Sequence, residues 1–274
     1  MQRKAGTQTP HRGILERAAL LLLFGLAGIA VPVHAINESA ATHPDPQLAP
    51  VQGECVVLLH GLGRTHRSMA RIESLLREAG YTTANIDYPS QSQTIEASAR
   101  VAVPEGVREC RRTGARTIHF VTHSMGGLLL RYYLSTAKVD ELGRVVMLGP
   151  PNQGSEVADT LAGTAIYDRV NGPAGAQLVT GADGIAARLG PVHFPLGIIT
   201  GNEQTAIDSV LATRIPGEND GKVAVERAKV EGMHDFLVLP VNHTFMVVND
   251  VVIGQTLQFL RHGAFLHEEE QAAH

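Results

Sequence analysis

Short apolar runs rich in β-branched residues alternate with amphipathic stretches from Cys55 to about Leu260. This pattern is typical of a parallel sheet whose strands are buried on both faces by helices. The predicted strands are 55–59, 82–87, 117–122, 144–148, 195–200 and 235–239. Helical spacing predicts helices over 68–79, 94–111, 125–134 and 247–260. The sequence therefore predicts an α/β fold with a mostly parallel, twisted sheet and helices on both faces.

Two segments depart from this regular pattern. Pro104 lies inside the helix predicted over 94–111, and we expect it to kink or split that helix, with Pro104 as the first residue of a second piece. The region from Asn152 to about Val192 is dense in Gly and Ala. We interpret it as a small cap over the carboxyl edge of the sheet, with a set of irregular loops and short helices as the alternative.

The first 35 residues have the features of a signal peptide. A basic segment precedes an uncharged apolar run from Ala18 to Val33, and Val33-His34-Ala35 has the small-residue pattern of a cleavage site. We expect cleavage near Ala35 and a periplasmic or secreted protein. An uncleaved anchor is the alternative, because the apolar run is only slightly shorter than the roughly 17 residues that span a bilayer.

The remaining chain is long enough for one good-sized domain, since the sequence has 274 residues, of which 44% are hydrophobic. We expect a flexible lead-in over 36–52, one domain over 53–265 and a polar tail over 266–274. No feature of the sequence fixes the oligomeric state, and we expect a monomer.

Charge and cysteine content narrow the function classes. The formal net charge is −4, and removal of residues 1–35 leaves 19 basic and 26 acidic side chains. This balance argues against a nucleic-acid partner, because an acidic surface repels phosphate backbones. The only cysteines are Cys55 and Cys110. In an oxidising compartment they can form a disulfide, and two buried thiols are an equally good interpretation.

Ser124 is the candidate nucleophile, in the segment Thr122-His123-Ser124-Met125-Gly126-Gly127. It lies at the turn between a predicted strand and a predicted helix, where a strained bend lifts a hydroxyl above the sheet. Gly126 and Gly127 supply the small neighbours that such a turn needs. Thr122 departs from the G-x-S-x-G pattern, because a β-branched residue replaces the first Gly.

A serine hydroxyl needs a base, and the base needs an orienting acid. His243 follows the last predicted strand and is the candidate base; its rival His234 precedes that strand and should lie at the opposite edge of the sheet. Asp220 follows the strand at 195–200 on a turn-rich loop and is the candidate acid. Capping of local backbone is the alternative role for Asp220, and Asp208, Glu203 and Glu218 are alternative acids.

An oxyanion hole requires two preplaced donors. We assign the backbone N–H groups of Met125, which follows the nucleophile, and of Leu62, in the glycine-rich segment His60-Gly61-Leu62-Gly63. His60 is interpreted as a structural histidine. The 13 histidines show no H-E-x-x-H or comparable ligand spacing, so we predict neither a metal site nor a cofactor.

Five segments together resemble the bacterial lipase and esterase branch of the α/β-hydrolase superfamily. They are His60-Gly61-Leu62-Gly63, the Ser124 motif, Gly149-Pro150-Pro151-Asn152-Gln153-Gly154-Ser155, Asn219-Asp220-Gly221-Lys222-Val223 and Asn242-His243. The resemblance implies a sheet of the eight-stranded type, with first strands that can be missing here. It also implies a Ser124, Asp220 and His243 triad and hydrolysis of small-molecule or lipid carboxylic esters through an acyl-enzyme, with transient contact to a lipid surface.

Three alternatives to ester hydrolysis stay open at this point. The same residues could transfer an acyl group to an alcohol or cleave a thioester. A non-catalytic α/β-hydrolase fold that acts as a binding protein is a further alternative, and Thr122 is the feature that favours it. A complete set of Ser, Asp and His with both donor loops favours an enzyme.

Overall fold

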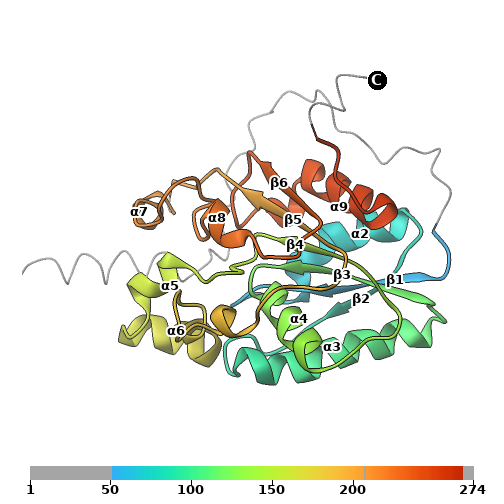
Figure 1. The fold of residues 1–274 in the computed structure, drawn as a ribbon, viewed down its shortest axis with the longest axis horizontal. Helices are drawn as coiled ribbons and strands as arrows, with labels where there is room; N and C mark the ends of the chain where they lie inside the picture. The colour runs from blue at the N-terminus through green and yellow to red at the C-terminus, as the bar shows by residue number, and fades with distance from the viewer. Residues whose placement is uncertain (1–50, 207, 268–274) are drawn as a thin grey trace, which may run out of the picture.

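The computed structural model describes residues 51–206 and 208–267, which form a six-stranded sheet flanked by helices (Figure 1). All neighbouring strands are parallel, in the order β2-β1-β3-β4-β5-β6. The strands are β1 (Glu54–Leu59), β2 (Thr82–Ile86), β3 (Thr117–His123), β4 (Leu142–Leu148), β5 (Leu196–Gly201) and β6 (Asp235–Leu239). The predicted α/β fold with a parallel sheet is confirmed.

Helices cover both faces of this sheet. In Figure 1, α2 and α9 lie on one side, and α3 and α4 lie on the other. The longer helices are α2 (Ala70–Glu78), α3 (Ile95–Arg112), α4 (Met125–Thr136), α6 (Ala165–Ala176) and α9 (Asp250–His262). The short ones are α5 (Glu156–Leu161), α7 (Ser209–Ala212), α8 (Val225–Ala228) and the 3-10 helices η1 (His66–Met69), η2 (Ile185–Arg188) and η3 (Met246–Val248).

Two hydrophobic clusters lie on opposite faces of the sheet, because successive side chains of a strand point to opposite sides. In β1, Val57 packs in the cluster that includes α3 and α4, whereas Val56 and Leu58 pack in the cluster that includes α2 and α9. Residues 55–59 are all fully buried. A central strand buried on both faces therefore appears in the sequence as an uninterrupted apolar run.

The expectation that Pro104 splits its helix is wrong, because α3 runs unbroken from Ile95 to Arg112 with Pro104 inside it. Proline removes the hydrogen bond to the carbonyl four residues earlier. That carbonyl belongs to Arg100, whose side chain is exposed, so water can reach this side of the helix. Buried residues on the side that faces the sheet, among them Ala99, Ala102 and Val103, hold the helix in place.

The last helix begins later than predicted. Residues 246–248 form the 3-10 helix η3, and α9 starts at Asp250. Asn249 sets this boundary, because its side chain accepts hydrogen bonds from the backbone N–H groups of Val251 and Val252. At the other end Gly263 adopts a left-handed conformation and closes the helix.

The region predicted as a cap contains α5 and α6, which follow β4 and lie beyond the carboxyl ends of the strands (Figure 1). It packs on the loop between β2 and α3. The Gln177 side chain accepts a hydrogen bond from the Ile95 N–H, and the Gln91 side chain donates one to the Val170 carbonyl. A Cβ at Gly172 would lie 1.7 Å from the Gln91 carbonyl oxygen, so only glycine permits this approach.

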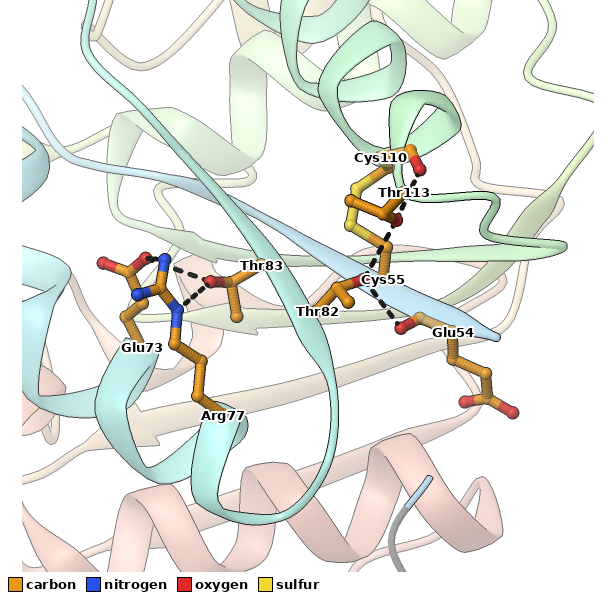
Figure 2. The surroundings of a disulfide bond; sticks show 8 residues. All are labelled: Glu54, Cys55, Glu73, Arg77, Thr82, Thr83, Cys110 and Thr113. Atoms are coloured by element: carbon orange, nitrogen blue, oxygen red, sulfur yellow. Dashed lines mark hydrogen bonds and ion pairs between the residues drawn. A yellow bond between two sulfur atoms is a disulfide. The ribbon is translucent and has the colours of Figure 1, made fainter. Parts of the chain in front are cut away.

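A disulfide joins Cys55 at the start of β1 to Cys110 near the end of α3, with a Cα–Cα distance of 5.6 Å (Figure 2). The Thr113 hydroxyl donates a hydrogen bond to the Cys110 carbonyl and lies 3.3 Å from the Thr82 hydroxyl. The structure therefore favours the disulfide over two free buried thiols. It ties the amino edge of the sheet to the helix that covers it.

Several sequence predictions fall outside the described residues. They are the signal peptide over 1–35, the lead-in up to residue 50 and the tail from residue 268. Among the helices that the described residues form, none combines the length and the hydrophobicity needed to cross a bilayer.

Candidate active site

Ser124 occupies a strained turn between β3 and α4. Its φ of 52° and ψ of −124° make it the one non-glycine residue with positive φ in the described part of the chain. Such a conformation costs on the order of 1–3 kcal/mol and persists only where the surroundings impose it. Here the Ser124 N–H donates to the Leu148 carbonyl on β4. The turn thus presents the hydroxyl at the carboxyl edge of the sheet.

Glycines at the start of α4 allow this turn to form. A Cβ at Gly126 would lie 2.6 Å from the Leu59 carbonyl oxygen and 2.9 Å from that of His60. These are backbone atoms at the end of β1, so a larger residue would force the helix away from the sheet. Gly126 therefore holds the helix start, and with it Ser124, against β1.

Thr122, the residue that departs from the usual motif, is fully buried. Its hydroxyl faces Gly127, where a Cβ would lie 3.4 Å from the Thr122 Oγ1 atom. That hydroxyl has no hydrogen-bond partner within the described residues. A Cβ at Gly127 would come closer still to the Met147 Sδ atom, at 3.1 Å, and to the Pro150 Cβ atom, at 3.2 Å, so the missing side chain relieves crowding among all three neighbours.

His243 lies within hydrogen-bonding distance of Ser124, since its Nε2 atom is 3.0 Å from the Ser124 Oγ. Its Nδ1 atom is 2.7 Å from the Oδ2 atom of Asp220. Because a carboxylate only accepts, the proton of neutral His243 lies on Nδ1 and the lone pair on Nε2 faces the serine hydroxyl. The side chain of His243 is therefore oriented to accept the serine proton.

Asp220 makes both kinds of contact that the sequence left open. Its Oδ1 atom accepts hydrogen bonds from the backbone N–H groups of Lys222 at 3.0 Å and Val223 at 2.8 Å, which is local capping. Its Oδ2 atom is free for His243. The carboxyl group is fully buried, so these donors and the imidazole replace the water that it loses.

The alternative residues lie elsewhere. Asp208 binds the Lys222 ammonium at 2.9 Å and the Thr205 hydroxyl at 2.6 Å. Glu203 and Glu218 are exposed to solvent. His234 accepts a hydrogen bond from the Leu196 N–H at the amino end of β5, at the edge of the sheet opposite to Ser124. The structure thus brings Ser124, Asp220 and His243 together and leaves these four apart.

The two predicted oxyanion donors flank Ser124. Met125 is the first residue of α4, and an N–H at this position has no partner inside the helix. The loop with Leu62 lies beside the serine, because a Cβ at Gly61 would be 3.2 Å from the Ser124 Cβ. In the part of the chain that the structure describes, the Leu62 N–H donates to no backbone carbonyl or side chain. Both N–H groups are therefore available to a ligand.

His60 holds the loop that carries Leu62. It is fully buried, its Nδ1 atom lies 2.9 Å from the Gly61 carbonyl oxygen, and its ring stacks on Tyr88 with 4.0 Å between ring centres. The Tyr88 hydroxyl donates a hydrogen bond to the His60 carbonyl. Burial lowers the pKa of His60. These contacts fit the structural role expected for His60.

Two residues next to the site were quoted from the sequence only as members of longer motifs, with no role of their own. Gly149, at the end of β4, has a φ of 54°, and a Cβ there would lie 3.1 Å from both the Asp220 Oδ2 and the His243 Nδ1 atoms. His123, which directly precedes the nucleophile, has its Nε2 atom 3.0 Å from the His243 carbonyl oxygen. The Gly149-Pro150-Pro151 sequence after a strand is the signal that could have marked the first.

Among residues 51–206 and 208–267, no group of three or more His, Cys, Asp or Glu side chains is placed to hold a metal ion. The polar groups that converge at the carboxyl edge are instead a hydroxyl, an imidazole and a carboxylate in a row, beside two free backbone N–H groups. This combination can remove a proton from the serine hydroxyl and stabilise a nearby oxyanion.

Known structures share this fold. The lipase BlEst2 of Bacillus licheniformis in its propeptide form superimposes with a TM-score of 0.61 at 20% identity, over 81% of this chain and 53% of that one. Its mature form superimposes with a TM-score of 0.55 at 20% identity, over 81% of this chain and 95% of that one. Phospholipase PlaB of Legionella pneumophila superimposes with a TM-score of 0.51 at 19% identity, over 64% of this chain and 45% of that one. The chain thus spans about half the length of the propeptide form.

No curated protein matches the sequence. The model of a protein family described as alpha/beta hydrolase fold matches residues 54–200, which run from the first residue of β1 through most of β5 and include the Ser124 turn. This match covers more than half of the chain. Together with the parallel sheet and the placement of the serine turn, it shows that the chain belongs to the α/β-hydrolase fold family.

Proposed function

We propose that this protein is a serine esterase or lipase that hydrolyses carboxylic esters through an acyl-enzyme on Ser124. The observation that carries the proposal is the chain of contacts from Ser124 Oγ to His243 Nε2 at 3.0 Å and from His243 Nδ1 to Asp220 Oδ2 at 2.7 Å. A lipase and a phospholipase among the proteins of the same fold support it.

In the first half of the reaction, Ser124 Oγ attacks the carbonyl carbon of the ester while His243 Nε2 takes the hydroxyl proton. The carbonyl oxygen becomes an oxyanion, which accepts hydrogen bonds from the Leu62 and Met125 N–H groups. The bond to the leaving alkoxy group then breaks. His243 gives its proton to that oxygen, so an alcohol departs and the acyl group stays on Ser124.

In the second half, His243 Nε2 takes a proton from a water molecule, whose oxygen attacks the acyl carbonyl carbon. The tetrahedral intermediate uses the same two N–H donors. It collapses to the free acid as the proton returns from His243 to Ser124 Oγ. Asp220 stabilises the imidazolium that forms in both halves, and its own capping donors keep it oriented.

A fluorophosphonate probe tests this assignment directly, because it forms a covalent bond with an activated serine. We expect labelling of the native protein and none of Ser124→Ala. The matched control is Ser135→Ala, in which an exposed serine near the end of the same helix is removed. Labelling that survived in Ser124→Ala would contradict the proposal.

Ester substrates with different acyl chains define the class that the enzyme accepts. A series of p-nitrophenyl esters, followed by emulsified lipid esters, distinguishes an esterase from a lipase by the chain length that gives the highest kcat/KM. A competing alcohol in the same assay reveals acyl transfer if the new ester forms faster than the free acid. Folded protein that neither reacts with the probe nor cleaves any ester would instead be a binding protein.

We also propose that the protein is exported, with residues 1–35 removed near Ala35. The Cys55–Cys110 disulfide supports this, because such bonds persist in oxidising compartments. N-terminal sequencing of protein from the periplasm or medium should give Ile36 or a neighbour as the first residue. Recovery in the membrane fraction with residues 1–35 intact would indicate an anchor.

A further inference from the structure

His123 is a buried imidazole that the reaction described above does not use. It is the last residue of β3, directly before Ser124, and only 4% of it is exposed. Its ring lies 5.0 Å from the ring of His243, tilted by 43°. A polar side chain in this position needs a reason, because burying it without hydrogen bonds is costly.

The contact of His123 fixes its tautomer. Its Nε2 atom lies 3.0 Å from the carbonyl oxygen of His243. A carbonyl only accepts, so the proton of His123 is on Nε2 and donates to that oxygen. The Nδ1 atom has no hydrogen-bond partner among the described residues and faces Gly61, where a Cβ would come within 3.2 Å of it.

The surroundings keep His123 uncharged. Burial lowers its pKa well below the ordinary value, and His243, Arg64 and His60 add electrostatic effects in the same direction. All three neighbours carry or can carry positive charge. The nearby carboxylate, Asp220, binds the far nitrogen of His243. A charged His123 would therefore oppose the imidazolium that His243 forms during the reaction.

Apart from the contact between its Nε2 atom and Ser124, His243 is held at three points of its backbone and ring. Its N–H donates to the Asp220 carbonyl at 2.9 Å, its Nδ1 faces the Asp220 carboxylate, and its carbonyl accepts from His123. The first two contacts come from one loop. Among the hydrogen bonds of the described residues, the one from His123 is what ties the His243 backbone to β3, directly before Ser124.

We propose that His123 is a positioning residue, whose neutral Nε2–H fixes the His243 backbone relative to Ser124 so that the base stays in reach of the serine hydroxyl. The assignment deepens the proposed function and rests on it for its effect on rate. It also gives the His of the Ser124 motif a physical role. A hydrogen-bond donor one residue before the nucleophile can reach from the end of β3 to the loop that carries His243.

The tautomer is tested first, on the native protein. In ¹⁵N NMR we expect the His123 ring to remain neutral with its proton on Nε2 between pH 5 and pH 8. A His123 that titrates near pH 6.5, or that carries its proton on Nδ1, would overturn the proposal. This measurement needs no substrate, so it decides on His123 even if the protein hydrolyses no ester.

The rate is tested with His123→Phe, which keeps a ring but lacks the donor, and with His123→Gln, whose amide can donate. We expect kcat to fall about tenfold to a hundredfold in the Phe variant with little change in KM, because a displaced base slows the chemical step. The Gln variant should recover much of the loss. The downfield Nδ1 proton signal of His243 should broaden in the Phe variant and return in the Gln variant.

His119→Phe is the matched control, because His119 is a second buried histidine on β3, placed near the other edge of the sheet beside Glu54. It should lower stability and leave kcat unchanged. Equal losses of kcat in both Phe variants would mean that His123 contributes only to core packing, and this would contradict the positioning role. An active native enzyme with full kcat in His123→Phe would contradict the positioning role while leaving the proposed function intact.

Discussion

The two edges of the sheet differ in how their residues affect stability. At the amino edge, the Cys55–Cys110 disulfide and the contact between His119 and Glu54 join β1 to its neighbours. At the carboxyl edge, Ser124 has a strained backbone, Asp220 is a buried carboxylate, and His123 has an unpartnered nitrogen among the described residues. One edge collects links that stabilise the fold, and the other collects groups that destabilise it.

This difference shows that the stable part of the fold supports unfavourable conformations at the candidate site. Strained conformations and buried polar groups concentrate at functional sites and persist only because the rest of the structure holds them. The hydrophobic layers between the edges and the disulfide below them provide that support. Substitutions at the carboxyl edge should therefore change rate, and substitutions at the amino edge should change stability.

The largest expected effect is on rate, in Asp220→Asn. An amide would present the wrong partner to His243 Nδ1, and loss of the orienting carboxylate in triad enzymes lowers kcat about 10⁴-fold. Asp208→Asn is the matched control, because Asp208 is also buried but binds Lys222 and Thr205 instead. Ester hydrolysis by both variants measures the effect. Similar rates for the two variants would contradict the assignment of Asp220 as the carboxylate that orients His243.

The next effect is on stability, in the double variant Cys55→Ala and Cys110→Ala. The disulfide closes a loop with a sequence separation of 55, and its loss should lower the free energy of unfolding by about 4 kcal/mol. Urea unfolding measures the change, and kcat at 25 °C should stay as in the native protein. A parallel loss of kcat in the folded double variant would mean that the two edges are not independent.

Ser124→Gly should raise stability while removing activity. Glycine adopts a positive φ without the steric cost that Ser124 bears, although its freedom in the unfolded chain offsets part of the gain. We expect a net gain of about 1 kcal/mol in urea unfolding. Ser135→Gly, in the helical part of α4, should have the opposite sign. A destabilised Ser124→Gly would argue against strain at the turn.

Acid should weaken both edges together. Burial lowers the pKa of His60, His119 and His123 in the folded protein. Below the ordinary histidine pKa of about 6.5 the unfolded chain binds protons that the folded chain does not, so stability is full above that pH and falls below it. Each histidine can contribute up to about 1.4 kcal/mol per pH unit. Urea unfolding between pH 5 and pH 8 measures this slope, and a flat profile would contradict it.

Much of the fold follows from local patterns. The six predicted strands agree with the structure to within two residues, because buried parallel strands are continuous apolar runs with turn residues at their ends. The prediction at Pro104 was wrong because tertiary packing overrode a local preference. Local chemistry disfavours proline in a helix, but packing of Ala99 and Val103 against the sheet holds α3 together. The predicted start of the last helix was wrong for a related reason, since the cap at Asn249 outweighed apolar spacing.

The sequence by itself determined the chemical groups and their order along the chain, with Ser124, Asp220 and His243 each placed after a strand. The parallel sheet makes those strand ends neighbours, which is why residues 119 positions apart can meet. Only the tertiary structure decided which acid meets His243, that Gly149 leaves room for the pair, and that His123 reaches the His243 carbonyl. These depend on how closely segments that are far apart in the sequence approach one another, which no local pattern encodes.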